Sequence, residues 1–196
     1  DGLTDMRVTR ARVPEEVAAD TITEAELAEE LAAVLGRVCG EGRFSGTVLV
    51  ASGNDIVFEH ACGEASRRFH APVTIDTKFN IGSLNKMFTA IAIAQLAEAG
   101  RLSYDDPVSD HLDESWLPES ITDSVTIHHL LTHTSGLGEV FNDTFEQASR
   151  RRFRSVEDYR ELARADSVRF SPGTDWRFSN TGYVLLGAIV EGVSGE

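Results

Sequence analysis

Lysine is almost absent from this sequence, since only Lys78 and Lys86 occur among its 196 residues. All other residues in the combined count of lysine and arginine are arginines, which keep their proton at neutral pH. Acidic residues outnumber these basic ones by 32 to 18, so the formal net charge is −14. This balance argues against nucleic acid or an anionic membrane as partner. We expect a small-molecule substrate instead.

Long apolar runs are missing as well. No stretch of about 18 apolar residues occurs, and the residues after Asp1 lack a basic and then apolar leader. We therefore expect no integral membrane segment, and a soluble protein that is cytoplasmic or exported after removal of a signal. Internal repeats and low-complexity segments are also absent, and nothing in the sequence indicates an oligomeric state.

Cysteine is too scarce for a disulfide scaffold, because Cys39 and Cys62 are the only two. Cys39 precedes one predicted strand and Cys62 ends the next. A hairpin would bring the two close together, so a single bridge remains open. We favour free, buried thiols.

The elements that are present predict an α+β fold. Thr23 and Glu26 form a capping box at the start of an amphipathic helix. Residues 44–51 and 56–61 are β-rich runs joined by a turn, which predicts a hairpin. Further helices are expected from the apolar run after Ser83 to Gly100, over 125–132, over 155–164, and after a cap at Ser179-Asn180.

Domain organisation follows from these patterns. Residues 1–21 lack periodicity and are expected to form an N-terminal extension, with one domain over 22–196. A two-stranded sheet is marginal alone, so we expect this domain to be partial, with C-terminal strands missing from the chain.

Ser83 and Lys86 lie three residues apart at the start of the helix that ends before Gly100. Positions three apart share a helix face at about 5–6 Å between Cβ atoms, so the amine can reach the hydroxyl. This pair is typical of serine acyl transfer with lysine as base. The residues that follow are apolar on all sides, which predicts a buried helix.

Lys86 must lose its proton to act as a base. Half neutrality at pH 7 requires lowering a lysine pKa by roughly three units. Burial supplies up to about 3–5 units, whereas a helix N-terminus contributes only about 0.3–1 kcal/mol. Burial must therefore dominate. The alternative is that Ser83 only caps the helix and Lys86 is a surface lysine. If Ser83 and Lys86 were the only evidence, we would favour this alternative.

Three histidines, His128, His129 and His133, are also close together in the sequence. A spacing of four places His129 and His133 on one face of a helix, as in some metal sites. No nearby cysteine or carboxylate completes a ligand set, so we expect neither a metal nor a cofactor.

Four segments together resemble the serine β-lactamase-related family, which includes class C type β-lactamases, D-Ala-D-Ala carboxypeptidases, D-aminopeptidases and family VIII esterases. The segments are 79–86 (Phe-Asn-Ile-Gly-Ser-Leu-Asn-Lys), 102–108, 127–137 (with His-Leu-Leu-Thr-His-Thr-Ser-Gly-Leu) and 172–187 (with Phe-Ser-Asn-Thr-Gly-Tyr). The resemblance implies a β-lactamase/transpeptidase-like fold with an antiparallel sheet flanked by helices and a mostly helical region. It implies Ser83 as acylated nucleophile, Lys86 as its proton acceptor, and Asn180 as an amide that contacts substrate or Lys86.

The sequence departs from the family pattern in two places. Family members usually carry Tyr-x-Asn, but this chain has Phe178-Ser179-Asn180, and Phe178 has no hydroxyl to relay a proton. Tyr183 is five residues further on and is not expected to replace it. The family's third motif, Lys/His-x-Gly, with one of the two oxyanion-hole amides on its strand, does not occur in this chain.

We therefore expect a serine hydrolase acting through an acyl-enzyme on an ester, a β-lactam or a D-amino-acid peptide or amide, with esters favoured. The alternative from another class is a penicillin-recognition-type binding scaffold, catalytically weakened or inactive because Phe178 replaces tyrosine. A third interpretation, a helical module without a site, requires the Ser83 motif to be accidental.

Overall fold

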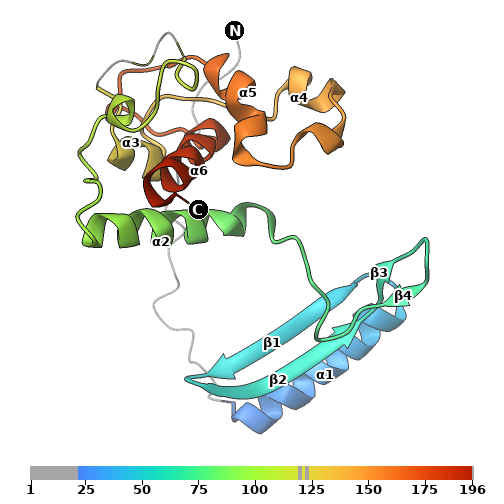
Figure 1. Ribbon diagram of the computed structural model, residues 1–196. Coiled ribbons are helices and arrows are strands. Elements are labelled where there is room, and N and C mark those ends of the chain that lie inside the picture. Colours follow the sequence, from blue (N-terminus) through green and yellow to red (C-terminus); the bar gives the residue numbers. More distant parts are fainter. Residues whose placement is uncertain (1–21, 119–120, 122–123, 196) are drawn as a thin grey trace, which may run out of the picture. The chain divides into compact units, whose positions relative to one another are not determined.

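The computed structural model describes residues 22–118, 121 and 124–195. These form two compact units, one ending at Phe79 and the other beginning at Asn80. Residues 1–21, for which an extension is expected, lie outside the described part. Figure 1 labels the elements of each unit.

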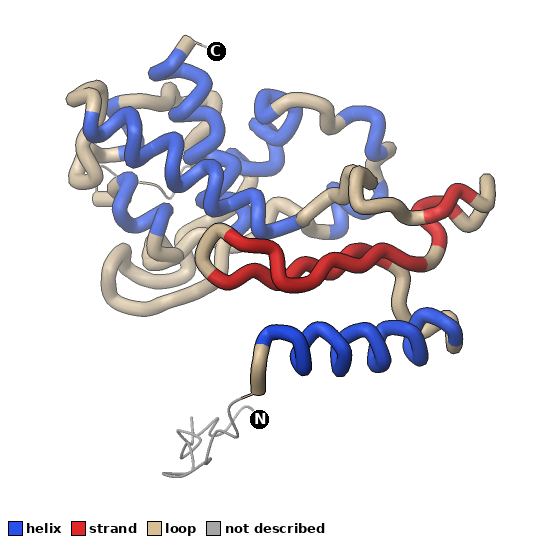
Figure 2. The backbone as a smooth tube through the Cα atoms, turned by 90° about the horizontal axis from the view of Figure 1, so that it is seen from below, coloured by secondary structure: helices blue, strands red, loops and turns tan. Residues whose placement is uncertain are grey.

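The N-terminal unit is a helix packed on a hairpin (Figure 2). Its elements are α1 (Glu24–Gly40), β1 (Gly46–Ser52), β2 (Asp55–Cys62), β3 (Glu64–Ser66) and β4 (Ala71–Pro72). The capping box predicted at Thr23 and Glu26 is confirmed, because the Glu26 N–H donates to Thr23 Oγ1 at 3.2 Å and Thr23 N–H donates to Glu26 Oε2 at 2.7 Å. The predicted hairpin is confirmed too. Its strands pair antiparallel, with Ser52 opposite Asp55 across the turn.

The expectation of free thiols is wrong, because Cys39 and Cys62 form a disulfide. Cys39 lies in the last turn of α1 and Cys62 ends β2, and the packing of α1 against β2 brings their Cα atoms to 6.2 Å. The sequence predicts the helix and the two strands, but not which face of the hairpin packs against the helix. The bridge thus joins the two layers of this unit.

Loss of this bridge is expected to lower the free energy of unfolding of the N-terminal unit by about 3 kcal/mol, the usual value for closing a loop of this size. Paired substitutions Cys39→Ser and Cys62→Ser, compared with the parent protein in urea with amide exchange followed in α1 and β2, measure the loss. Reductant should destabilise the parent and leave the double variant unchanged. Equal midpoints for parent and variant would show that the bridge carries no stability.

The C-terminal unit is helical. Its elements are η1 (Gly82–Leu84), α2 (Asn85–Glu98), η2 (Val108–Asp110), α3 (Ile127–Leu131), α4 (Asp143–Gln147), η3 (Arg150–Arg152), η4 (Val156–Tyr159), α5 (Arg160–Arg164) and α6 (Asn180–Ser194). Helix α6 packs against α2, α3 and α5, as Figures 1 and 2 both show for α2. Leu185, Leu186 and Ile189 of α6 are fully buried, and so are Ile93 of α2 and Leu130 of α3. This core determines how the starts of α2 and α6 are placed.

The prediction that the helix after Ser83 is buried all round is wrong. Ile93 and Leu96 are buried, whereas Leu84, Met87, Phe88 and Ile91 are each more than half exposed. An apolar surface on every side predicts burial only if neighbours pack on every side, and α6 covers one face of α2. The predicted stop is confirmed, since Gly100 has φ +66° just after the last turn.

Candidate active site

Ser83 is presented at the start of α2 by a turn that requires glycine. Gly82 has φ +54°, in the left-handed region that side chains disfavour. Its N–H donates to Asn80 Oδ1 at 2.8 Å, which closes the turn before η1 begins. Ser83 is exposed, so its hydroxyl is accessible from solvent.

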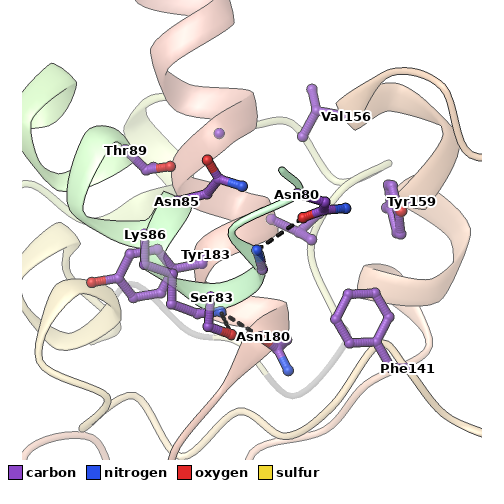
Figure 3. Close-up of a pocket in the computed structure, with 13 residues that line it drawn as sticks. Asn80, Ser83, Asn85, Lys86, Thr89, Phe141, Val156, Tyr159, Asn180 and Tyr183 are labelled. Atoms are coloured by element: carbon purple, nitrogen blue, oxygen red, sulfur yellow. Dashed lines mark hydrogen bonds between the residues drawn. The ribbon is translucent and has the colours of Figure 1, made fainter. Parts of the chain in front are cut away.

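Lys86 lies one turn after Ser83 and points back to it (Figure 3). Its Nζ is 3.3 Å from Ser83 Oγ and 2.6 Å from Asn180 Oδ1. Lys86 therefore contacts both of the other residues expected in the site, Ser83 and Asn180. Asn180 is 94 positions from Lys86 in the sequence, so the packing of α6 on α2 makes this contact.

The environment of Lys86 favours the neutral amine. Burial lowers the pKa of Lys86 below its usual range, and the nearby Glu139 carboxylate partly opposes this by raising it. The direction agrees with the requirement that burial must dominate. Two aromatic rings also face the amine, with Nζ 4.9 Å from the Phe178 ring centroid and 5.4 Å from that of Tyr183.

Asn180 begins α6 directly after its cap, Ser179, whose hydroxyl accepts from the Gly182 N–H at 3.0 Å. With its Oδ1 on Lys86, the Asn180 amide donates from Nδ2 to Glu139 Oε2 at 2.7 Å. Both halves of the amide are thus used. Glu139 adds a carboxylate to the group of Ser83, Lys86 and Asn180.

His133 holds the segment that contains Phe178. Its Nδ1 accepts from the Ser179 N–H at 3.1 Å, its carbonyl accepts from the Arg177 N–H at 2.9 Å, and its ring lies 4.8 Å from that of Phe178. Burial, and then the charge of Lys86, lowers the pKa of His133. A neutral ring with Nδ1 as acceptor agrees with this shift.

No phenol takes the place of the family tyrosine among the residues that the structure describes around Lys86. Phe178 lies where its ring faces the amine but has no hydroxyl. The Tyr183 hydroxyl donates to the Leu131 carbonyl at 3.1 Å, and burial raises the pKa of Tyr183. Its proton is therefore already used in a structural hydrogen bond.

A pocket of about 540 Å³ adjoins Ser83 and Lys86 (Figure 3). Phe141, Val156 and Tyr159 line it together with Asn180 and Tyr183. The Phe141 and Tyr159 rings lie 6.3 Å apart, so this part of the lining is aromatic. The pocket therefore offers an apolar surface beside the hydroxyl, suited to an apolar substituent of a substrate.

His129 and His60 make contacts within the fold. His129 does not share a helix face with His133, because α3 ends at Leu131 and His133 has φ +60°. His129 Nδ1 lies 3.2 Å from the Thr126 N–H in the cap of α3. His60 Nε2 lies 3.9 Å from Cys39 Sγ, but that sulfur is in the disulfide.

Sequence reasoning did not single out Glu139, nor His133 as a partner of the Ser179 backbone. One sign of Glu139 was available, since it is an acidic residue within the otherwise uncharged run Leu-Gly-Glu-Val-Phe (137–141). A charge in such a run indicates that a partner is near. Its identity could not be inferred, because Asn180 is 41 positions away.

Known proteins are similar to this chain in fold and in sequence. The family model described as Beta-lactamase matches residues 23–196. Esterase EstB from Burkholderia gladioli is 36% identical over 90% of this chain and 48% of its own length, and the putative penicillin-binding protein PbpX from Bacillus subtilis is 31% identical over 78% of this chain and 36% of its own. A crystal structure of a penicillin-binding protein from Bacillus halodurans is 41% identical with a TM-score of 0.71, over 82% of this chain and 48% of the other.

The chain spans about a quarter to a half of the length of the curated relatives it matches. Within that span, the segments around Ser83, His133 and Asn180 stand in the order that the sequence resemblance requires. The described residues of the helical unit bring them together around one amine. Together with the family match over residues 23–196, these observations establish that the chain belongs to the serine β-lactamase-related family.

Proposed function

We propose that this protein is a serine hydrolase in which Ser83 is acylated and Lys86 is the base. The observation that carries the proposal is the position of Lys86 Nζ, 3.3 Å from Ser83 Oγ, in surroundings that lower its pKa. A general base must lie within hydrogen-bond reach of the proton it takes, and distances are often longer before substrate binds. The Ser83 proton passes to Lys86 as Oγ attacks the carbonyl carbon, and the bond from that carbon to the leaving group then breaks. Water hydrolyses the acyl-enzyme and regenerates the Ser83 hydroxyl.

The same start of α2 can stabilise the charge that develops on the carbonyl oxygen. The first N–H groups of a helix lack acceptors within it, and Ser83 lies in the turn that leads into α2. We assign the Ser83 N–H as one donor to this oxygen. Such a donor is worth about 10²–10³ in kcat.

Esters with good leaving groups are the favoured substrates in this proposal. Hydrolysis of an amide or a β-lactam needs a proton for the departing nitrogen. Neither Phe178 nor the engaged Tyr183 hydroxyl supplies one, which leaves the proton that Lys86 has taken from Ser83. An activated ester releases a stable anion and needs no such proton. The aromatic lining at Phe141 and Tyr159 suits an apolar acyl or alcohol group. The relatives include a protein named an esterase, in agreement with this preference.

Labelling by a p-nitrophenyl alkylphosphonate tests the nucleophile. Attack by Ser83 Oγ at phosphorus forms the O–P bond, releases p-nitrophenolate, and leaves one adduct that intact mass and peptide mapping locate. Ser83→Ala should not be labelled, while Ser167→Ala, which changes another exposed serine of this unit, should be labelled like the parent. Ser83 would be rejected as the nucleophile if the adduct formed on another residue, or if the folded protein were not labelled at all.

A weakened binding scaffold is the second candidate, and the missing hydroxyl at Phe178 favours it. It predicts a different result with p-nitrophenyl butyrate and a chromogenic cephalosporin. A scaffold is labelled or binds without sustained turnover of either compound. The hydrolase turns over the ester faster than the cephalosporin, and the reverse order would contradict the proposed ester preference.

A further inference from the structure

Glu139 is held rigidly beside Asn180. One carboxylate oxygen, Oε2, accepts from Asn180 Nδ2 at 2.7 Å, and the other, Oε1, accepts from the Phe141 N–H at 2.8 Å. The preceding residue is fixed as well, because the Gly138 N–H donates to the buried carboxylate of Asp166 at 2.8 Å. The Glu139 carboxylate is therefore built into the loop after Gly136.

This carboxylate determines which way the Asn180 amide points. An ionised carboxylate only accepts hydrogen bonds, so it must face the NH₂ end of the amide. The carbonyl end, Oδ1, then points at Lys86, as the 2.6 Å distance shows. The reversed amide would place its oxygen against the Glu139 carboxylate, which is repulsive, and its NH₂ against the Lys86 amine.

The direction of the amide matters for the chemistry of Lys86. A neutral amine has two N–H donors and one lone pair. Donation to Asn180 Oδ1 uses one N–H and leaves the lone pair free for the Ser83 hydroxyl at 3.3 Å. A reversed amide would donate to the lone pair and occupy the base.

We propose that Glu139 is a positioning residue, which fixes the Asn180 amide so that the lone pair of Lys86 is directed at Ser83. The inference rests on the proposed function for the role of Lys86. The proposed function concerns Ser83, Lys86 and Asn180, whereas this inference assigns a positioning role to a further carboxylate, that of Glu139.

The charge of Glu139 has a second effect that can be measured separately. Within the part of the chain that the structure describes, the titratable groups that face Lys86 are Glu139, the neutral ring of His133 and the Tyr183 phenol. Among them Glu139 is the one anion, and it raises the pKa of Lys86 against the effect of burial. Removing the charge should therefore favour the neutral amine.

Because the chain has two lysines, ¹³Cε-lysine labelling gives two signals, which Lys78→Arg assigns. In Glu139→Gln the amide oxygen can still accept from Asn180, although the acceptor for the Phe141 N–H is lost. The charge is gone as well, so the titration of Lys86 moves to lower pH. Glu191→Gln is the matched control. It makes the same change on an exposed position of α6, about 16 Å along the axis from Asn180, and should leave the Lys86 titration where it is in the parent.

Acylation rates distinguish the positioning effect of Glu139 on Asn180 from the effect of the Glu139 charge on Lys86. Glu139→Gln shifts the rising limb of the pH–rate profile to lower pH and keeps much of the plateau rate. Glu139→Ala shifts the limb similarly, but frees the amide, and its plateau falls about ten-fold to a hundred-fold, the usual effect of misplacing a reacting group. Thermal midpoints of all variants show that each is folded.

Two results would overturn the inference: a Lys86 titration in Glu139→Gln that matches Glu191→Gln, or equal plateau rates in the alanine and glutamine variants. Failure of the proposed function gives a different result. In that case Ser83 is not acylated even in the parent protein, while the Lys86 titration still responds to Glu139, which upholds the link between these residues.

Discussion

Replacing Lys86 with methionine is expected to slow the acylation of Ser83 by about 10²–10⁴-fold, the usual contribution of a positioned general base. Methionine has nearly the length of lysine and no basic group, so the change removes proton transfer and keeps the packing between Phe178 and Tyr183. Single-turnover kinetics with p-nitrophenyl butyrate, followed by release of p-nitrophenolate, measure the loss.

The pH dependence provides a second signature of the same residue. Acylation requires neutral Lys86, so the rate rises as pH rises through its pKa, and burial places this rise below the usual lysine range. Lys86→Met should lose the rise. Lys86→Arg should be as slow as the methionine variant, because a guanidinium keeps its charge but cannot release a proton.

Lys78→Met is the matched control, since it removes the other lysine of the chain. It should retain the parent rate and profile. An arginine variant that stays within ten-fold of the parent would show that Lys86 acts only through its charge, and the assignment as base would be rejected.

Phe178→Tyr is expected to raise turnover of amide and β-lactam substrates by about 10²–10⁴-fold, the range for a restored general acid. The Phe178 ring faces Lys86 and is 43% exposed, so a hydroxyl can be added without overpacking the core. Activated esters should gain much less, because their leaving groups need no proton. The ratio of cephalosporin to p-nitrophenyl butyrate turnover, measured in parent and variant, isolates this effect.

Tyr183→Phe tests whether the neighbouring phenol already acts as the acid. Its hydroxyl donates to the Leu131 carbonyl, so its removal should lower stability by about 1 kcal/mol. Its effect on turnover should be small beside the gain in Phe178→Tyr. A loss of 10² or more in the parent background would show that Tyr183 supplies the proton, and the explanation based on Phe178 would fail.

Local patterns in the sequence predicted most of the elements around the site. Thr23 and Glu26 cap α1, and Ser179 caps α6, because the atoms involved belong to residues three apart. The proximity of Ser83 and Lys86 is local for the same reason, since one helical turn separates them. Such features depend on backbone geometry that neighbouring residues set.

Features that depend on packing between distant segments were missed or wrong. The exposed face of α2 at Met87 and Ile91 could not be told from its buried face, because both are apolar in sequence. The Cys39–Cys62 bridge does not follow from the sequence, since the strand pattern does not encode which face of the hairpin α1 covers. The link from Glu139 to Asn180 had no local signal for its partner.

The order of residues alone therefore determined that a hydroxyl and an amine lie one turn apart at the start of an apolar helix, and which family the chain resembles. Only the tertiary structure decided the state of that amine. Packing of α6 on α2 brings Asn180 to Lys86, and the loop after Gly136 adds Glu139. Two aromatic rings also face the amine. The physical reason is that the pKa of an amine depends on its desolvation and on nearby charges. The residues that surround Lys86 are far apart in the sequence, since Asn180 is 94 positions from Lys86 and 41 positions from Glu139.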